Sequence, residues 1–336
     1  MATMQRVAFV LILAAAPWLM GAQRISAPTV PQAPAPTTPA PLFKSGTELV
    51  VVHATVRDRE GAHVSGLPES AFRVFESGAP RPISVFARPD EPVTIGLIID
   101  VSGSMEPLRE RLAYAASRFA DTGSRDDEVF AVVVGDDPVP VLPPDAPFTA
   151  DPQVLRTAIA DAHRPGGMTA LHDAIIYGLD YLSRGTHARR ALIVISDGID
   201  NSSRADFDEV LRHTLASNAA LYAVGLVDPI SLIRDPGHLR KLARATGGEA
   251  YFPATNADVG GALDAIARDV HSAYALGFAP TGSPHDGKGH RVSVSVQSPD
   301  GRSLKVRARE RYIAGSDAET RETGRLTEPD ARRAPE

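Results

Sequence analysis

The sequence predicts an α/β protein in which a central, doubly wound, mostly parallel sheet is flanked by a small all-β domain. Three observations support this fold class: nearly continuous apolar runs in the centre, helical apolar spacing between them, and short alternating segments on both flanks. The chain has 336 residues, of which 43% are hydrophobic and 23% charged. That composition is typical of a globular protein, and the length allows two domains of roughly 100–200 residues.

Four apolar runs in the centre have the length and composition of strands that are covered on both faces. They span residues 93–99, 129–134, 191–195 and 221–225, and a shorter strand is expected at 249–252. Helical spacing marks residues 108–119, 171–182, 207–215, 239–243 and 259–270. We also expect Ser203 and Asp206 to form a capping box before the third of these helices. This alternation predicts a Rossmann-like sheet, whose ligands bind at the carboxyl ends of the strands.

The two flanks of this region contain shorter strand candidates. Residues 48–57 alternate and are rich in Val, and 72–75 and 83–86 follow; beyond the central region, 274–278, 291–297 and 303–308 repeat the pattern. Together the flanks, residues 44–92 and 272–314, amount to about 90 residues, close to the ~100 of a small β-sandwich. We therefore predict one immunoglobulin-like (Ig-like) sandwich built from both flanks, with the α/β domain, residues 93–271, inserted between them. The alternative is two independent β-extensions.

The ends of the chain have the composition of export and linker segments. Arg6 precedes an apolar stretch that ends at Met20, and small residues follow up to Ala22, which predicts a signal peptide over residues 1–22. The stretch has about 14 residues, whereas a spanning helix needs roughly 20. An uncleaved anchor is the alternative. Residues 23–43 are predicted to be a Pro-rich linker and residues 315–336 a disordered tail. We expect an extracytoplasmic (periplasmic or secreted) protein with no transmembrane span in its mature form.

Charge and cysteine usage exclude several classes of function. The net charge is −6, with 35 Lys and Arg against 41 Asp and Glu, which argues against nucleic-acid binding. The chain has no cysteine, so disulfides, thiolate zinc sites, iron–sulfur clusters and a cysteine nucleophile are excluded.

The strongest chemical signal directly follows the first buried strand, where the sequence reads Asp-Val-Ser-Gly-Ser over residues 100–104. An Asp with hydroxyls two and four residues later places three oxygens on one turn, and Gly103 permits a tight backbone there. A further hydroxyl ends a glycine-rich loop, and a second carboxylate follows the strand at 191–195. Because the tips of neighbouring parallel strands lie close together, we expect five residues to share one ion: Asp100, Ser102, Ser104, Thr169 and Asp197.

This set of two carboxylates and three hydroxyls suits a hard divalent cation, Mg²⁺ first, with Mn²⁺ or Ca²⁺ as alternatives. Two carboxylates balance the charge of the ion, whereas neutral hydroxyls leave it electrophilic. Mg²⁺ prefers six ligands and usually keeps waters, one of which a partner's carboxylate can replace. Asp and Ser after a strand also often only cap the following helix, which is the alternative interpretation of residues 100–104.

In this order the five residues resemble the metal-ion-dependent adhesion site (MIDAS) of von Willebrand factor type A (VWA) domains. The resemblance covers roughly residues 93–271, and residues 52–67, 72–78 and 307–312 resemble the flanks of bacterial secreted proteins with a VWFA-related domain. It implies that Asp100, Ser102 and Ser104 coordinate the ion, with Thr169 and Asp197 in contact directly or through water. It also implies a protein partner that offers an Asp or Glu carboxylate, in adhesion or envelope assembly.

Two alternatives remain beside this function: a metal-dependent hydrolase that uses the same site, and a structural envelope protein with an empty site. Phosphatases with an aspartyl nucleophile need a second carboxylate two residues later, where this chain has Ser102. The sequence contains no Gly-x-Ser-x-Gly elbow, P-loop Gly-Lys-Ser/Thr or His-Glu-x-x-His pattern. We therefore predict a binding protein and not an enzyme. The nearby Asp173 and Asp200 are interpreted as loop or helix-cap carboxylates.

Overall fold

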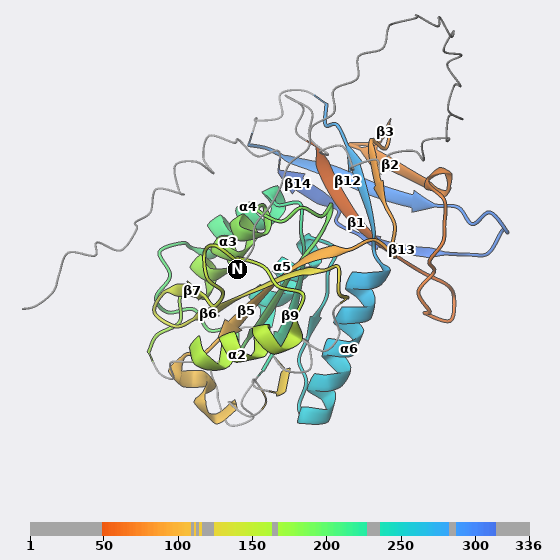
Figure 1. Ribbon diagram of the computed structural model, residues 1–336. Coiled ribbons are helices and arrows are strands. Elements are labelled where there is room, and N and C mark those ends of the chain that lie inside the picture. Colours follow the sequence, from red (N-terminus) through yellow and green to blue (C-terminus); the bar gives the residue numbers. More distant parts are fainter. Residues whose placement is uncertain are drawn as a thin grey trace, which may run out of the picture. The chain divides into compact units, whose positions relative to one another are not determined.

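The computed structural model describes residues 49–108, 111, 114, 115, 124–162, 167–226, 236–281 and 287–313 (Figure 1). Its central sheet has the strand order β10-β9-β8-β5-β6-β7. Five strands are parallel: β5 (Val93–Asp100), β6 (Glu128–Val134), β8 (Arg189–Ser196), β9 (Ala220–Gly225) and β10 (Ala250–Tyr251). β7 (Pro138–Pro140) pairs antiparallel with β6 at one edge. The predicted α/β class is therefore confirmed, as a mixed sheet.

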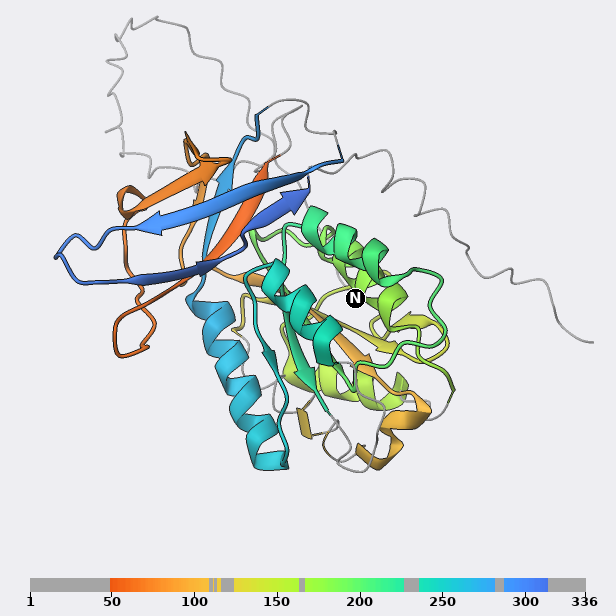
Figure 2. The ribbon, with the colours of Figure 1, turned by 180° about the vertical axis from the view of Figure 1, so that it is seen from behind.

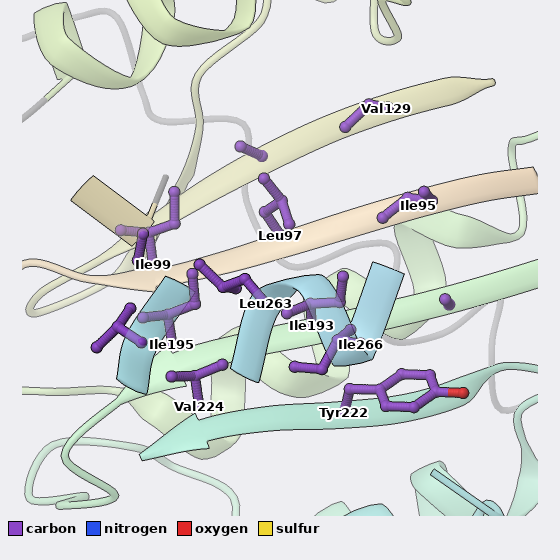
Figure 3. Packing of buried hydrophobic residues seen from close by; sticks show 14 of the residues in the cluster. Ile95, Leu97, Ile99, Val129, Ile193, Ile195, Tyr222, Val224, Leu263 and Ile266 are labelled. Atoms are coloured by element: carbon purple, nitrogen blue, oxygen red, sulfur yellow. The ribbon is translucent and has the colours of Figure 1, made fainter. Parts of the chain in front are cut away.

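One face of the central sheet packs against α2 (Pro152–Ala162) and α6 (Asn256–Ser272). Because side chains alternate along a strand, Ile95, Leu97 and Ile99 of β5 all point to this face. Figure 3 shows them on the same side as Leu263 and Ile266 of α6, and all five are at most 1% exposed. Full burial of each such side chain stabilises the fold by about 1.5–3 kcal/mol.

The opposite face packs against α3 (Leu171–Leu182), α4 (Phe207–Ala216) and α5 (Pro236–Ala245). In Figure 2, α4 and α5, green and teal, lie in front of the sheet. Gly178 lets α3 approach closely, since a Cβ there would lie only 2.7 Å from Cδ1 of Ile98. Helices on both faces explain why the strands are apolar throughout and are recognisable in the sequence.

Three local features differ from the sequence prediction. The first predicted helix begins as the 3₁₀ helix η2 (Gly103–Leu108), and most of its remainder lies outside the described residues. α2 was not predicted from the sequence, and Leu155 is its only fully buried residue. The expected capping box is wrong: Asp206 is the N-cap of α4 and accepts from the Glu209 amide, whereas the Ser203 hydroxyl accepts from the Asp173 amide.

The flanks form two four-stranded sheets, each of which combines strands from both ends of the described chain. One has the order β13-β1-β11-β4 and the other β14-β12-β2-β3. The N-terminal strands are β1 (Val50–Arg57), β2 (Phe72–Glu76), β3 (Ala79–Arg81) and β4 (Val85–Ala87), with the 3₁₀ helix η1 (Glu69–Ala71). The C-terminal strands are β11 (Tyr274–Phe278), β12 (Gly289–Val296), β13 (Lys305–Ala308) and β14 (Arg311–Ile313).

The register of these sheets ties the two flanks together. β1 pairs with both β11 and β13, and β2 pairs with β12, all antiparallel. Their buried side chains form one apolar cluster that includes Val52, Phe72, Tyr274 and Tyr312. The structure thus pairs the flanks with each other, unlike the alternative of two independent extensions. The immunoglobulin-like class and the domain boundaries stay predictions.

Buried polar contacts join the flanking sheets to the α/β region within one compact unit, Gly46–Glu336. Arg309, between β13 and β14, donates to the carbonyls of Ser217 and Leu215 at the C-terminus of α4, at 2.7 and 3.0 Å. His53 of β1 contacts the Asn218 carbonyl, and burial lowers the pKa of His53 to about 4, so its ring is neutral at pH 7. The chain enters β5 after β4 and leaves α6 into β11. The flanking sheets therefore connect to the amino end of β5, away from Asp100.

No helix among the described residues is both long and apolar enough to cross a membrane. The predicted signal peptide (residues 1–22), linker (23–43) and tail (315–336) lie outside the described residues.

Candidate metal centre

Asp100 is the last residue of β5 and is fully buried. Its Oδ1 accepts from the Ser102 amide at 3.0 Å, and its Oδ2 accepts from the Ser196 hydroxyl at 2.6 Å. Ser196 ends β8, the strand next to β5, and its Oγ in turn accepts from the Gly198 amide at 3.0 Å. The following turn and the neighbouring strand together orient this carboxylate.

Burial raises the pKa of Asp100, the nearby carboxylate of Asp197 adds a smaller increase, and the hydrogen bonds from Ser102 and Ser196 act in the opposite direction; together they bring the pKa to about 6. At pH 7 the group is ionised in a place that disfavours the charge. A divalent cation beside it would compensate that charge. The electrostatics of Asp100 therefore fit a cation site at this strand end.

Ser102 directly precedes η2, and Ser104 is the second residue of that 3₁₀ helix. Ser102 is buried and Ser104 is exposed, and their Oγ atoms lie 3.1 Å apart. Two adjacent ligands of an octahedral Mg²⁺, each ~2.1 Å from the ion, are separated by about 3 Å. The spacing of the two hydroxyls thus matches that of two neighbouring ligands of one ion.

The loop that carries Thr169 is held against the turn after β5 and against the end of β6. The Gly103 amide donates to the Gly167 carbonyl at 3.3 Å, and the Ala170 amide donates to the Gly135 carbonyl at 2.8 Å. The Met168 amide donates to the Asp136 carboxylate at 2.7 Å. Gly167 has φ +92°, and a Cβ there would lie 3.1 Å from that carboxylate, so the loop requires glycine at this position. Thr169 is 1% exposed.

Asp197 begins the loop after β8 and is partly exposed; its Oδ1 accepts from the Ile199 amide at 2.9 Å. Further along this loop, Asn201 Oδ1 accepts from the Thr169 amide at 2.7 Å, and the Asn201 amide donates to the Thr169 carbonyl at 3.0 Å. The Ser202 amide also donates to that carbonyl, at 3.2 Å. The loops that carry Thr169 and Asp197 are therefore joined.

The structure brings together the three segments that carry the five predicted residues, since hydrogen bonds link each segment to another. The centre combines two carboxylates with three hydroxyls. Among the described residues there is no metal-binding group made of three or more His, Asp or Glu side chains, so a metal site here depends on the hydroxyls as well. Coordination by Asp100, Ser102, Ser104, Thr169 and Asp197 stays a prediction.

Sequence reasoning missed Ser196 and Asn201 as partners of this centre. Ser196 directly precedes Asp197 at a strand end, and this adjacency is the one feature of the sequence that could have indicated its contact with Asp100. No sequence spacing relates Asn201 to Thr169, because their contact arises only when two loops meet.

Asp173 and Asp200 orient backbone, as predicted. The Asp173 carboxylate accepts from the amides of Arg204 and Ala205, both at 3.0 Å. The Asp200 carboxylate accepts from the Ser203 amide at 3.2 Å and lies 3.1 Å from Nδ1 of His172. Both carboxylates hold the loop between β8 and α4 in place.

The fold and the site define a class: an α/β domain with an oxygen-lined centre at the carboxyl edge of a mostly parallel sheet. The family model of the von Willebrand factor type A domain matches residues 94–267, which is more than half of the chain. The chain belongs to this family.

Solved structures that match this chain include a von Willebrand factor type A protein from Catenulispora acidiphila, with 16% identity, a TM-score of 0.48 and coverage of 83% of this chain and 77% of that one. The conserved hypothetical protein BatB from Bacteroides thetaiotaomicron has 21% identity, a TM-score of 0.41 and coverage of 53% and 96%. The vWF domain of the type V pili tip protein Mfa5 from Porphyromonas gingivalis has 13% identity, a TM-score of 0.42 and coverage of 55% and 95%. No significant match was found among curated proteins.

Proposed function

We propose that the protein is an exported binding protein that holds a protein partner through a divalent cation, Mg²⁺ first, at a MIDAS-type site. The observation that carries the proposal is the pair of Ser102 and Ser104 hydroxyls, 3.1 Å apart, beside the buried carboxylate of Asp100. Thr169 and Asp197, on joined loops, would complete the set. Membership of the von Willebrand factor type A family supports a role in protein interaction.

The bound ion would supply a Lewis-acidic centre with room for one further anionic oxygen. Asp100, Ser102 and Thr169 are buried, whereas Ser104 is exposed and Asp197 partly exposed. An incoming Asp or Glu carboxylate therefore approaches from the side of Ser104 and Asp197. Neutral Ser and Thr ligands leave the positive charge of the ion available to that carboxylate.

An extracytoplasmic location, periplasmic or secreted, belongs to the same proposal. It rests on the charged start and apolar stretch of residues 1–22. Adhesion and envelope assembly are the roles that fit a metal-dependent binding protein in that place.

Metal binding is tested by thermal unfolding of the protein in EDTA and in millimolar MgCl₂. A ligand that binds only the folded state stabilises it by about 2.7 kcal/mol at a hundred times its Kd, so Mg²⁺ should raise the Tm of the wild type. Asp197→Ala should remove this rise. Asp151→Ala is the matched control, because Asp151 accepts from the Gln153 amide at the start of α2, away from the centre. A wild-type Tm that no divalent cation changes would contradict the proposal.

Partner binding is tested by capture from envelope extracts with Mg²⁺ and with EDTA. The wild type should capture its partner in Mg²⁺ and lose it in EDTA. Asp100→Ala should lose the captured protein even in Mg²⁺, while Asp151→Ala should retain it. Capture that persists equally in EDTA would show that the partner does not bind through the ion. Turnover of a phosphoester by the purified protein would favour the hydrolase alternative.

A further inference from the structure

Three consecutive amides of the Thr169 loop donate to three different residues. Those of Met168 and Ala170 donate to Asp136 and Gly135, which directly follow β6. The Thr169 backbone amide instead donates to Oδ1 of the Asn201 side chain. The backbone amide of Asn201 donates back to the Thr169 carbonyl. Asn201 thus contacts both the backbone amide and the carbonyl of Thr169. The Ser202 backbone amide, from the same loop, shares the carbonyl, but among the described contacts the Thr169 amide is held from this loop by the Asn201 side chain.

We infer that Asn201 is a positioning residue of the centre, which sets the place of the Thr169 hydroxyl relative to the ion. The inference rests on the function proposed above. Asn201 does not need to touch the ion itself, because its side chain is used by the Thr169 amide.

Because Thr169 is buried, the position of its backbone determines the position of its hydroxyl. Thr169 is 1% exposed, and its β-branched side chain has few rotamers, so the hydroxyl moves with the backbone. Asp197 is oriented separately, by the Ile199 amide at 2.9 Å. Loss of the Asn201 side-chain amide should therefore change the position of the Thr169 hydroxyl and leave the Asp197 carboxylate in place.

The substitution Asn201→Leu keeps the approximate shape of the side chain and removes its acceptor. The Thr169 amide then loses its partner, which favours a shift of the loop. Removal of residues that orient metal ligands typically lowers metal affinity roughly 10- to 100-fold. We expect a loss of that size for Mn²⁺, which serves as the probe ion.

The experiment is a double-mutant cycle on the full chain, with Mn²⁺ affinity measured by calorimetric titration after EDTA treatment and dialysis. The variants are Asn201→Leu, Thr169→Val and the double variant. Thr169→Val removes the hydroxyl and keeps the shape. If Asn201 acts through Thr169, Asn201→Leu lowers the affinity of the wild type but changes that of Thr169→Val by less than about threefold. Coupling of this kind is the mark of residues that act as a unit.

The matched control is Asp206→Ala, in the same loop, because Asp206 caps α4 and is not bonded to Thr169. It should lower the Tm while leaving the Mn²⁺ affinity near that of the wild type. Asn201→Asp, which keeps an acceptor for the Thr169 amide, should retain binding.

Two outcomes overturn the inference alone: wild-type affinity in Asn201→Leu, or an equal fold-loss with and without the Thr169 hydroxyl. Absence of Mn²⁺, Mg²⁺ and Ca²⁺ binding by the wild type instead overturns the proposed function, and the inference with it. The readouts for the wild type and for Asn201→Leu therefore distinguish the two failures.

Discussion

At the scale of single residues, burial and charge act in opposite directions on Asp100. The carboxylate is fully buried, and its pKa is raised to about 6 from an ordinary value of 3.8. The folded protein without metal therefore holds the Asp100 proton more tightly than the unfolded chain does. The free energy of unfolding of the metal-free protein therefore falls as the pH rises from about 4 to about 6, where the unfolded chain releases this proton and the folded protein still holds it. The same buried charge that destabilises the metal-free protein would attract a divalent cation.

Asp100→Asn should accordingly stabilise the protein in EDTA at pH 7, by up to about 3 kcal/mol, because the buried charge is removed while the shape is kept. The variant should also lose the Tm rise caused by Mg²⁺. Thermal unfolding in EDTA between pH 4 and pH 8 measures the first effect, and the stability difference between variant and wild type should grow with pH. Unfolding at pH 7 in MgCl₂ and in EDTA measures the second. A variant less stable than the wild type in EDTA at pH 7 would contradict this account of Asp100.

The residues of the centre differ in how far the sequence predicts them. Asp100, Ser102 and Ser104 belong to one turn, so their spacing is visible along the chain. Asn201 contacts Thr169 across 32 positions, and Ser196 contacts Asp100 across 96. Such partners are defined by the meeting of loops and not by any local pattern, so one sequence without structure does not identify them.

At the scale of elements, the strands with an uninterrupted apolar run were predicted well, and the short edge strand β10 (Ala250–Tyr251) was also expected, at residues 249–252, but the opposite edge strand β7 was not. β5 and β8 lie at the centre of the sheet and are buried almost throughout, which leaves a clear pattern. β7 consists of Pro138, Val139 and Pro140 and was missed, because proline argues against a strand. At an edge, a proline that lacks an amide donor is tolerated.

The end of α5 offers a test of how close the elements of the α/β region approach one another. Gly248 follows the helix, and a Cβ there would overlap the backbone carbonyl of Leu221 in β9. Gly261 lies on the exposed side of α6, and a Cβ there would have nothing within 4 Å. The two glycines therefore differ in the room around them.

Gly248→Ala should destabilise the protein by more than about 2 kcal/mol, since backbone must move to relieve the overlap. Gly261→Ala should stabilise it by roughly 0.5–1 kcal/mol, because alanine is the better helix former. Denaturant unfolding of both variants gives the two free energies. Equal effects would mean that β9 and the end of α5 are not packed as closely as described.

At the scale of the whole molecule, the flanks depend on each other. β1 has a C-terminal strand on either side, β11 and β13, and β2 pairs with β12 of the C-terminal flank. The sequence indicated this partnership only through the combined length of the flanks. The register itself was not predictable, because short alternating strands fit several pairings.

Deletion of the C-terminal flank tests this dependence. A chain that ends at residue 271 would leave β1 without β11 and β13, and β2 without β12, so their backbone groups would lose most of their ladder partners. It would also remove Arg309, which donates to the carbonyls at the end of α4. Unpaired strands with an exposed apolar face do not stay folded in water. We therefore expect limited proteolysis to cleave within residues 50–81 at the rate of an unfolded segment.

A chain that ends at residue 314 is the matched control, because it keeps β11 to β14 and lacks only the predicted tail. It should protect residues 50–81 as the full chain does. Continued protection of β1 and β2 in the chain that ends at 271 would mean that the N-terminal flank folds alone, and the inserted arrangement would then be wrong. The metal response separates the two regions: since Asp100 lies at the far end of β5 from β4, any truncated chain whose central sheet remains folded should still gain Tm from Mg²⁺.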